Sequence, residues 1–149
     1  MAGCDVRRND GFSLVEVLVA LTILAVGLLA LALLQVTAIK GNAIAAKSTV
    51  ATQLAQDRLE RFRHVAWDNI VSSGSSGYDN ATMAPQYANL PGAAGDNSVV
   101  RGTPFYRVWY VLNNTATLKT ITVWCCWQDE RRIWHNVMLT AQRSNVGGM

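Results

Sequence analysis

The chain has 149 residues, of which about 50% are hydrophobic and only 15% are charged, and its formal net charge is +3. This length allows one small domain beside a membrane segment, and so small a charge excess is only a weak sign of an acidic partner. The sequence contains no Gly-x-Ser-x-Gly, His-Glu-x-x-His or phosphate-binding loop, so we predict neither an enzyme nor a cofactor.

The first ten residues are polar and include Arg7 and Arg8. They hold no apolar segment, and the small residue Gly11 precedes the apolar run that follows. In a secretory signal peptide the small residues of the cleavage site come after the apolar run. The order found here therefore argues against ordinary signal-peptidase cleavage.

A long apolar run follows the sequence Gly-Phe-Ser-Leu-Val-Glu at residues 11–16. Between residues 17 and 34 the only polar side chain is Thr22. A helix of this length spans roughly the 30 Å of a hydrocarbon core, which predicts a transmembrane helix over residues 12–39. Glu16 lies at its start, where a carboxylate costs about a few kcal/mol unless it reaches the lipid headgroups or finds a positive partner.

The helical pattern continues beyond the apolar run, over residues 40–67. Apolar residues recur at spacings of three, four and seven, and Val50 and Leu54 widen the stripe that they form. No proline occurs between Gly11 and Pro85, so we predict a single helix from about Phe12 to about His64. The residues of this stripe are Ile44, Ala51, Ala55, Leu59, Phe62 and Ala66.

Residues 71–104 are rich in Gly, Ser, Asn and Pro and are predicted to form a loop. Asp79 and Asp96 lie in this segment, but the alternating oxygen ligands of a calcium loop are missing, so solvated turns are favoured over a calcium site. Three β-rich runs follow in residues 105–142, and residues 143–149 form a predicted flexible tail. The fold class is therefore α+β, with a three-stranded antiparallel sheet packed on the amphipathic half of the helix.

Cysteine and histidine do not predict a metal site. Cys125 and Cys126 are neighbours in a predicted strand, so their side chains point to opposite faces. A disulfide between these neighbours would close a strained ring, so two free thiols are favoured. A bond from an exposed thiol to a partner subunit in an oxidising periplasm is the less favoured alternative. Zinc is not expected, since His64 and His135 complete no known ligand spacing.

Aromatic residues in the strands accompany several arginines. Such residues can stack on bases and contact phosphates, which makes Arg107, Arg131, Arg132 and Trp134 candidates for surface or DNA binding. Packing in the core or at a subunit interface is the favoured interpretation, so nucleic acid is not an expected partner. The tryptophans concerned are Trp109, Trp124, Trp127 and Trp134.

The N-terminal pattern resembles the signal of type IV prepilins and type II secretion pseudopilins. The residues that carry this resemblance are Gly11, Phe12, Glu16 and the apolar helix behind them. The resemblance implies a leader peptide, residues 1–11, which a prepilin peptidase removes by cutting between Gly11 and Phe12 and then methylating Phe12. Cys4 leaves with this leader, and Glu16 becomes the fifth residue of the mature chain.

Cleavage would expose a cationic amine at Phe12, close to hydrocarbon. In a helical filament the Glu16 carboxylate of one subunit would neutralise the Phe12 amine of a neighbour, so that two costly charges satisfy each other. Arg7 and Arg8 before the span predict a cytoplasmic N-terminus and a periplasmic C-terminal domain in a single-pass inner-membrane protein. Incorporation into the filament or its tip would follow.

The second half of the chain resembles PilV-type minor pilins, through the helix ending LAQDRLERFR and the strand YRVWYV. Many major pilins have a proline at the position of Leu33 and two well-separated cysteines, and this chain has neither. The resemblance implies a low-copy structural subunit that helps to prime pilus assembly, with other minor and major pilins and the inner-membrane assembly platform as partners. The alternatives are an I-type minor pseudopilin of a type II secretion system, a DNA- or surface-binding minor pilin, and a plain signal-anchored periplasmic domain.

Overall fold

The computed structural model describes residues 11–145 of the chain. The predictions for Arg7, Arg8, Cys4, most of the leader peptide and the last residues of the tail lie outside the described residues. Two compact units are present, one up to Asn42 and the other from Ala43 onwards. Each unit is described by itself below.

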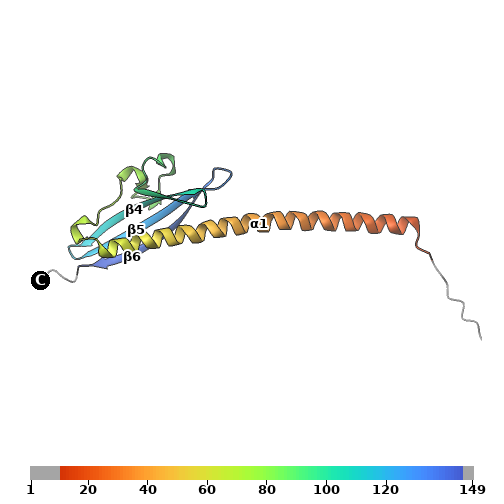
Figure 1. The fold of residues 1–149 in the computed structure, drawn as a ribbon, viewed down its shortest axis with the longest axis horizontal. Helices are drawn as coiled ribbons and strands as arrows, with labels where there is room; N and C mark the ends of the chain where they lie inside the picture. Colours follow the sequence, from red (N-terminus) through yellow and green to blue (C-terminus); the bar gives the residue numbers. More distant parts are fainter. Residues whose placement is uncertain (1–10, 146–149) are drawn as a thin grey trace, which may run out of the picture. The chain divides into compact units, whose positions relative to one another are not determined.

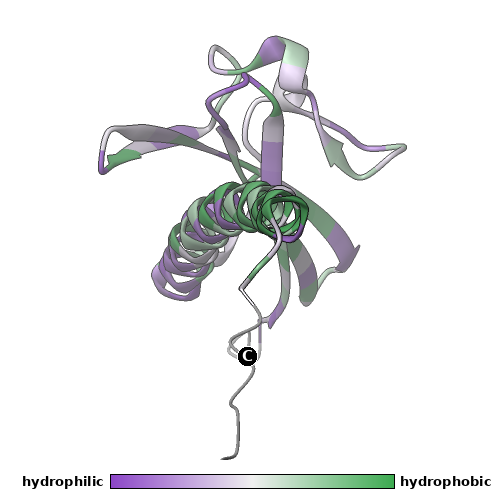
Figure 2. Ribbon diagram, turned by 90° about the vertical axis from the view of Figure 1, so that its right-hand side faces the viewer, coloured by the Kyte–Doolittle hydropathy of each residue, from purple (hydrophilic) through white to green (hydrophobic). Residues whose placement is uncertain are grey.

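The long predicted helix is confirmed as α1, Leu14–His64. Ser13 caps its start, because the Ser13 hydroxyl accepts a hydrogen bond from the backbone N–H of Val15 at 3.2 Å. In the apolar part, the hydroxyls of Thr22 and Thr37 donate to backbone carbonyls one turn earlier. These two hydroxyls are therefore satisfied within the helix, as a lipid environment requires. Figure 2 shows green apolar residues along the early turns of α1 and purple polar residues in the later turns.

The second unit contains a four-stranded antiparallel sheet, whereas the sequence predicted three strands. Figure 1 shows the strands stacked beside the last turns of α1, and the four strands follow one another in the order of the chain. Their bounds are β3 (Asp96–Val100), β4 (Thr103–Thr115), β5 (Leu118–Gln128) and β6 (Trp134–Ser144). The strand β6 runs into the predicted tail, so regular structure continues beyond residue 142.

The additional strand β3 lies inside the predicted loop of residues 71–104. Its sequence, Asp-Asn-Ser-Val-Val, begins with residues of low strand propensity, which is why its composition indicates a turn. It pairs with β4 through a two-residue turn at Arg101 and Gly102, whose φ angles are 49° and 77°. Two positive φ angles in succession give the tight hairpin that matches the twist of the strands.

The rest of the predicted loop also has short regular elements. They are the 3-10 turns η1 (Trp67–Asn69), η2 (Ser75–Gly77) and η3 (Tyr87–Asn89), and the small hairpin of β1 (Tyr78–Asp79) and β2 (Ala84–Pro85). This segment covers the face of the sheet that α1 leaves free. The helix ends at His64, so the predicted continuation to residue 67 is about one turn too long.

Two apolar clusters hold the second unit together, one on each face of the sheet. On the α1 face, Ala51 and Ala55 are fully buried and allow the helix to approach the strands closely. On the other face, Tyr78 and Leu90 from the covering segment pack on Trp124 of β5. Most of the predicted stripe is thus confirmed, except that Ile44 and Ala66 are exposed.

Candidate functional site

The start of α1 presents an accessible peptide segment. Gly11, Phe12 and Ser13 precede the helix and have no regular structure, and the Phe12 side chain is 82% exposed. A Cβ atom built on Gly11 would meet no other atom within 4 Å. A peptidase could therefore reach the bond between Gly11 and Phe12 without unfolding any packed element.

Glu16 lies in the first turn of α1, where the helix dipole favours a negative charge. Its side chain is exposed, and no ion pair to it occurs among residues 11–145. Ser13 was not among the residues predicted from the sequence, although Ser13 and Glu16 have the Ser-x-x-Glu spacing of a capping box. Glu16 thus has a local role at the helix start and a carboxylate that is free for a partner.

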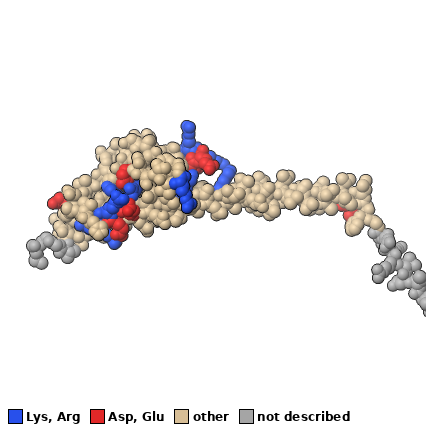
Figure 3. All heavy atoms as spheres, viewed as in Figure 1, with Lys and Arg blue, Asp and Glu red and all other residues tan. Residues whose placement is uncertain are grey.

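An uninterrupted apolar surface follows Glu16. Large side chains from Val17 to Ile39 are each 45% exposed or more. Figure 3 shows this part of α1 as tan atoms, with a red acidic group near its beginning. By length and composition this helix could cross a membrane, and so large an apolar surface requires lipid or other proteins as neighbours.

The comparison with known protein families agrees with this geometry. The family model described as the prokaryotic N-terminal methylation motif matches residues 6–32. The chain is prepilin-like. The match includes Gly11, Phe12 and Glu16 and covers only the beginning of the chain. No curated protein and no solved structure was found to match it.

Within a prepilin-like protein, the motif and the apolar helix fit membrane anchoring. The motif also suggests a structural subunit, and it is consistent with processing by a prepilin peptidase and with pilin assembly. The resemblance to prepilins and pseudopilins is therefore confirmed at the level of the N-terminal signal.

The prediction of Arg107 as a surface-binding residue is wrong. Its side chain is 6% exposed and lies between α1 and β3. The guanidinium donates to the Asp96 carboxylate at 2.5 and 2.9 Å, to Asp57 at 3.1 Å and to the backbone carbonyl of Leu54 at 3.0 Å. Although burial alone would lower the pKa of Arg107, its contacts with Asp96 raise that pKa above the ordinary value. Arg107 thus fastens the helix to the sheet.

The aromatic residues of the sheet pack mainly in the interior, in agreement with the interpretation favoured from the sequence. Trp109, Trp124 and Trp127 are at most 7% exposed. Trp134 is half-buried and stacks on Tyr87 at 5.6 Å between ring centroids. The structure consequently does not bring the four candidate binding residues together on one surface, because Arg107 and Trp134 are engaged in packing.

Arg131 and Arg132 do lie at the surface, in the turn between β5 and β6. The carboxylate of Asp129 shapes this turn by accepting hydrogen bonds from the backbone N–H groups of Arg131 and Ile133. The bond from Ile133, followed by the one from His135, lowers the pKa of Asp129. Neither arginine forms an ion pair within residues 11–145.

The prediction that Cys125 and Cys126 point to opposite faces of a strand is confirmed. Both thiols are free and fully buried, and they belong to different apolar clusters on opposite faces of β5. Burial raises the pKa of each thiol to about 12. Such buried, protonated thiols are poor nucleophiles at neutral pH.

The residues weighed for metal binding are occupied by other contacts. Asp79 accepts hydrogen bonds from the Ala81 N–H and the Thr82 hydroxyl, which lower its pKa, whereas Asp96 pairs with Arg107. Within the described part of the chain, no three His, Cys, Asp or Glu side chains are close enough together to bind a metal ion.

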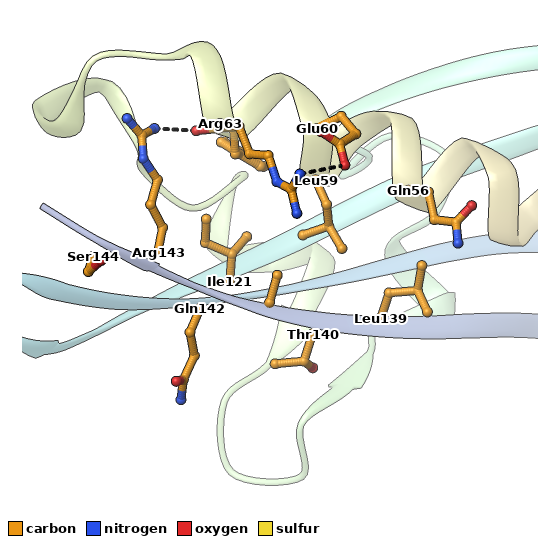
Figure 4. A pocket seen from close by; sticks show the side chains of 12 residues that line it. Gln56, Leu59, Glu60, Arg63, Ile121, Leu139, Thr140, Gln142, Arg143 and Ser144 are labelled. Atoms are coloured by element: carbon orange, nitrogen blue, oxygen red, sulfur yellow. Dashed lines mark hydrogen bonds and ion pairs between the residues drawn. The ribbon is translucent and has the colours of Figure 1, made fainter. Parts of the chain in front are cut away.

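A groove of about 540 Å³ lies between α1 and the edge strand β6. Figure 4 shows Leu59, Ile121 and Leu139 along it, with Arg63 paired to Glu60 at its side. Arg143 donates to the backbone carbonyls of Phe62 and Val65, near the end of α1. Glu60 is the one carboxylate among the residues lining the groove, so the groove does not offer a pair of acid–base groups for catalysis.

Proposed function

We propose that this chain is a minor type IV pilin of the PilV type, a structural subunit that helps to prime assembly of the pilus. The observation that carries this proposal is the exposed Gly11–Phe12 bond, placed five residues before Glu16 and directly ahead of an exposed apolar helix. A prepilin peptidase cuts this bond and methylates the new N-terminus at Phe12. The match to the methylation motif supports this step.

Glu16 then serves assembly. Once Phe12 carries the free amine, the Glu16 carboxylate of one subunit pairs with the Phe12 amine of its neighbour while the apolar helices pack together. The pairing fixes the stagger between subunits, because both charges are costly in an apolar interior unless they meet. The exposure of Glu16 and the lack of an ion pair to it within residues 11–145 support this role.

Before assembly, the apolar part of α1 anchors the protein in the inner membrane, with the N-terminus in the cytoplasm and the second unit in the periplasm. Arg7 and Arg8 favour this orientation. The partners are the prepilin peptidase, the assembly platform, and other minor and major pilins. A low copy number is favoured by Leu33, where many major pilins have proline, and by the two adjacent buried thiols in place of a separated disulfide.

The main alternative is an I-type minor pseudopilin of a type II secretion system, since the same N-terminal motif serves both machines. The genes beside this one distinguish the two: a pilus cluster supports the proposal, and a secretion cluster overturns it in favour of the pseudopilin.

Mass spectrometry of the protein purified from assembled fibres tests the processing step. We expect a chain that begins with methylated Phe12. A chain that still carries Gly11 and the residues before it would contradict the prepilin mechanism and would support a plain signal anchor.

Two substitutions of Glu16 separate its charge from its position in the helix. Glu16→Gln keeps a side chain that can complete the capping box but removes the carboxylate, and Glu16→Ala removes both. We expect both variants to be cleaved and inserted into the membrane yet to be absent from filaments. If Glu16→Gln enters filaments as the unsubstituted protein does, the charge-pairing role is wrong and Glu16 acts only as a helix-capping residue.

A further inference from the structure

Two hairpin tips lie at the same end of the sheet. The β3–β4 tip consists of Arg101 and Gly102, between the paired residues Val100 and Thr103. The β5–β6 tip is residues 129–133, between Gln128 and Trp134, which are also paired. Because the first residues of β4 pair with the last residues of β5, both tips project from one end of the sheet (Figure 1).

The helix α1 enters the second unit at this same end. Its Leu54 carbonyl is level with Arg107 of β4, and its Phe62 carbonyl is level with Arg143 near the end of β6. The seven residues from Leu54 back to Lys47 rise about 10 Å, and the four from Arg107 back to Thr103 cover about 13 Å. Lys47 is therefore level with the hairpin tips, close to Ala43, the first residue of the second unit.

The cations described in this unit fall into those with a hydrogen-bond or ion-pair partner and those without one. Four arginines form ion pairs with carboxylates, whereas Lys119 and Arg143 donate to backbone carbonyls. The paired arginines are Arg58, Arg61, Arg63 and Arg107. In the described part of this unit, the cations with neither kind of partner are Lys47, Arg101, Arg131 and Arg132, which we call the tip patch. Blue side chains gather at this end in Figure 3.

Acidic groups do not cancel the tip patch. The Asp129 carboxylate is engaged by His135 and by the backbone of its own turn, which leaves Glu130 as the freely exposed acid of this tip. Exposed aliphatic side chains stand beside the cations: Val99 is 68% exposed and Ile133 is 52% exposed. Cations next to exposed aliphatic groups are the chemistry of a surface that rests on an anionic lipid interface.

We propose that the tip patch docks on the anionic headgroups of the membrane that holds α1. The charge of the patch is complementary to acidic phospholipids, and only Lys40, Gly41 and Asn42 separate the apolar run of α1 from the unit that carries the patch. The docked hairpins hold the second unit in a defined orientation at the bilayer surface until the subunit leaves the membrane. This inference rests on the membrane-anchored state in the proposed function.

The test uses the full chain in lipid nanodiscs made either of phosphatidylcholine alone or with about 30% phosphatidylglycerol. Hydrogen exchange is followed at the backbone amides of residues 99–103 and 129–133. We expect slower exchange at both tips in the anionic discs at low salt, and the difference should disappear at about 0.5 M NaCl, where screening is strong. Amides of residues 121–127 in the core of β5 should exchange alike in both discs.

Matched double variants separate the patch from the total charge. Arg131→Gln/Arg132→Asn removes two cations from the patch, with Asn chosen because the φ of 61° at position 132 suits it. Each charge near an anionic surface contributes a factor of about five, so docking should weaken roughly 30-fold. Arg61→Gln/Arg63→Gln removes two exposed cations away from the tips and should leave the tip protection unchanged.

Three results would overturn the inference. The first is equal exchange at the tips in both kinds of disc while the chain is inserted. The second is an equal loss of protection in the two double variants. The third is protection of the tip amides in neutral discs, to the same extent as in anionic discs, when a single-stranded oligonucleotide is added. This result would assign the patch to nucleic acid. A chain that does not enter the discs at all would instead contradict the membrane-anchored state in the proposed function.

Discussion

Gly95 sits where the chain enters β3, and its missing side chain leaves room for a tryptophan ring. A Cβ atom at this position would lie 2.3 and 2.4 Å from two ring carbons of Trp109 and 2.8 Å from the Cβ of Ser73. Carbon atoms in contact normally lie about 3.5–4.0 Å apart, so the ring or the chain must move by more than about 1 Å. Substituting Gly95→Ala should therefore destabilise the second unit.

The Trp109 ring cannot move without losing other contacts. Its Nε1–H donates to the Val71 carbonyl at 3.0 Å, and the Arg58 guanidinium lies 3.8 Å from the ring centroid. The Gly95 N–H also donates to the Arg107 carbonyl at 2.9 Å. Overpacking costs about 1–3 kcal/mol, and one lost hydrogen bond adds about 1 kcal/mol. We expect a total of about 2–4 kcal/mol, or a fall in Tm of roughly 10–25 °C.

Urea unfolding of the full chain in detergent micelles, followed by tryptophan fluorescence, measures this loss. Gly92→Ala is the matched control in the same segment, because its nearest neighbour would be the Asn89 carbonyl oxygen at 3.7 Å, and it should change stability by less than about 0.5 kcal/mol. In a Trp109→Phe background, whose ring is smaller, Gly95→Ala should cost at least about 1 kcal/mol less. Equal stabilities of Gly95→Ala and Gly92→Ala would refute the steric argument.

Two further predictions concern the buried polar groups of this unit. Asp96→Ala should lower the free energy of unfolding by about 3 kcal/mol in the same assay, because it leaves the buried Arg107 charge without its closest partner. Asp57→Ala removes a half-exposed carboxylate and should cost about 1 kcal/mol. Similar costs for the two variants would refute this ranking. In the folded chain the pKa of Cys125 and of Cys126 is about 12, above the ordinary value of 9.0. Between these two pH values the folded chain therefore binds more protons than the unfolded chain. Its free energy of unfolding falls as the pH rises, by about 1.4 kcal/mol per pH unit for each thiol. Unfolding measured from pH 8 to 11 should accordingly show a shallower decline for Cys125→Ala than for the unsubstituted chain, and identical slopes would contradict the burial of this thiol.

The strong local patterns of the chain predicted its main elements. The apolar run and the stripe from Ala51 to Phe62 predicted α1, and strict strand composition predicted the three long strands. Adjacent placement in one strand was enough to separate Cys125 from Cys126, because side chains alternate along a strand. These features depend on residues that are close together in the sequence, so one sequence is enough to predict them.

Two of the failures share a cause, since both depended on contacts between distant residues. The strand β3 exists because it pairs with β4, although its own composition indicates a loop. Arg107 resembles a surface cation in sequence, but Asp57 and Asp96, far away along the chain, satisfy it in the interior. The local sequence around a residue does not indicate which distant residues will contact it in the folded chain.

By itself, the sequence determined the prepilin-like character of the protein, because that signal is a continuous stretch in which Gly11, Phe12, Glu16 and the apolar run act through local chemistry. Only the tertiary structure decided which arginines are free to meet a partner, since Arg107 and Arg58 are engaged by carboxylates whereas Arg131 and Arg132 remain exposed at a hairpin tip. The difference arises because a charge is neutralised by groups close in space, and the fold alone sets those distances.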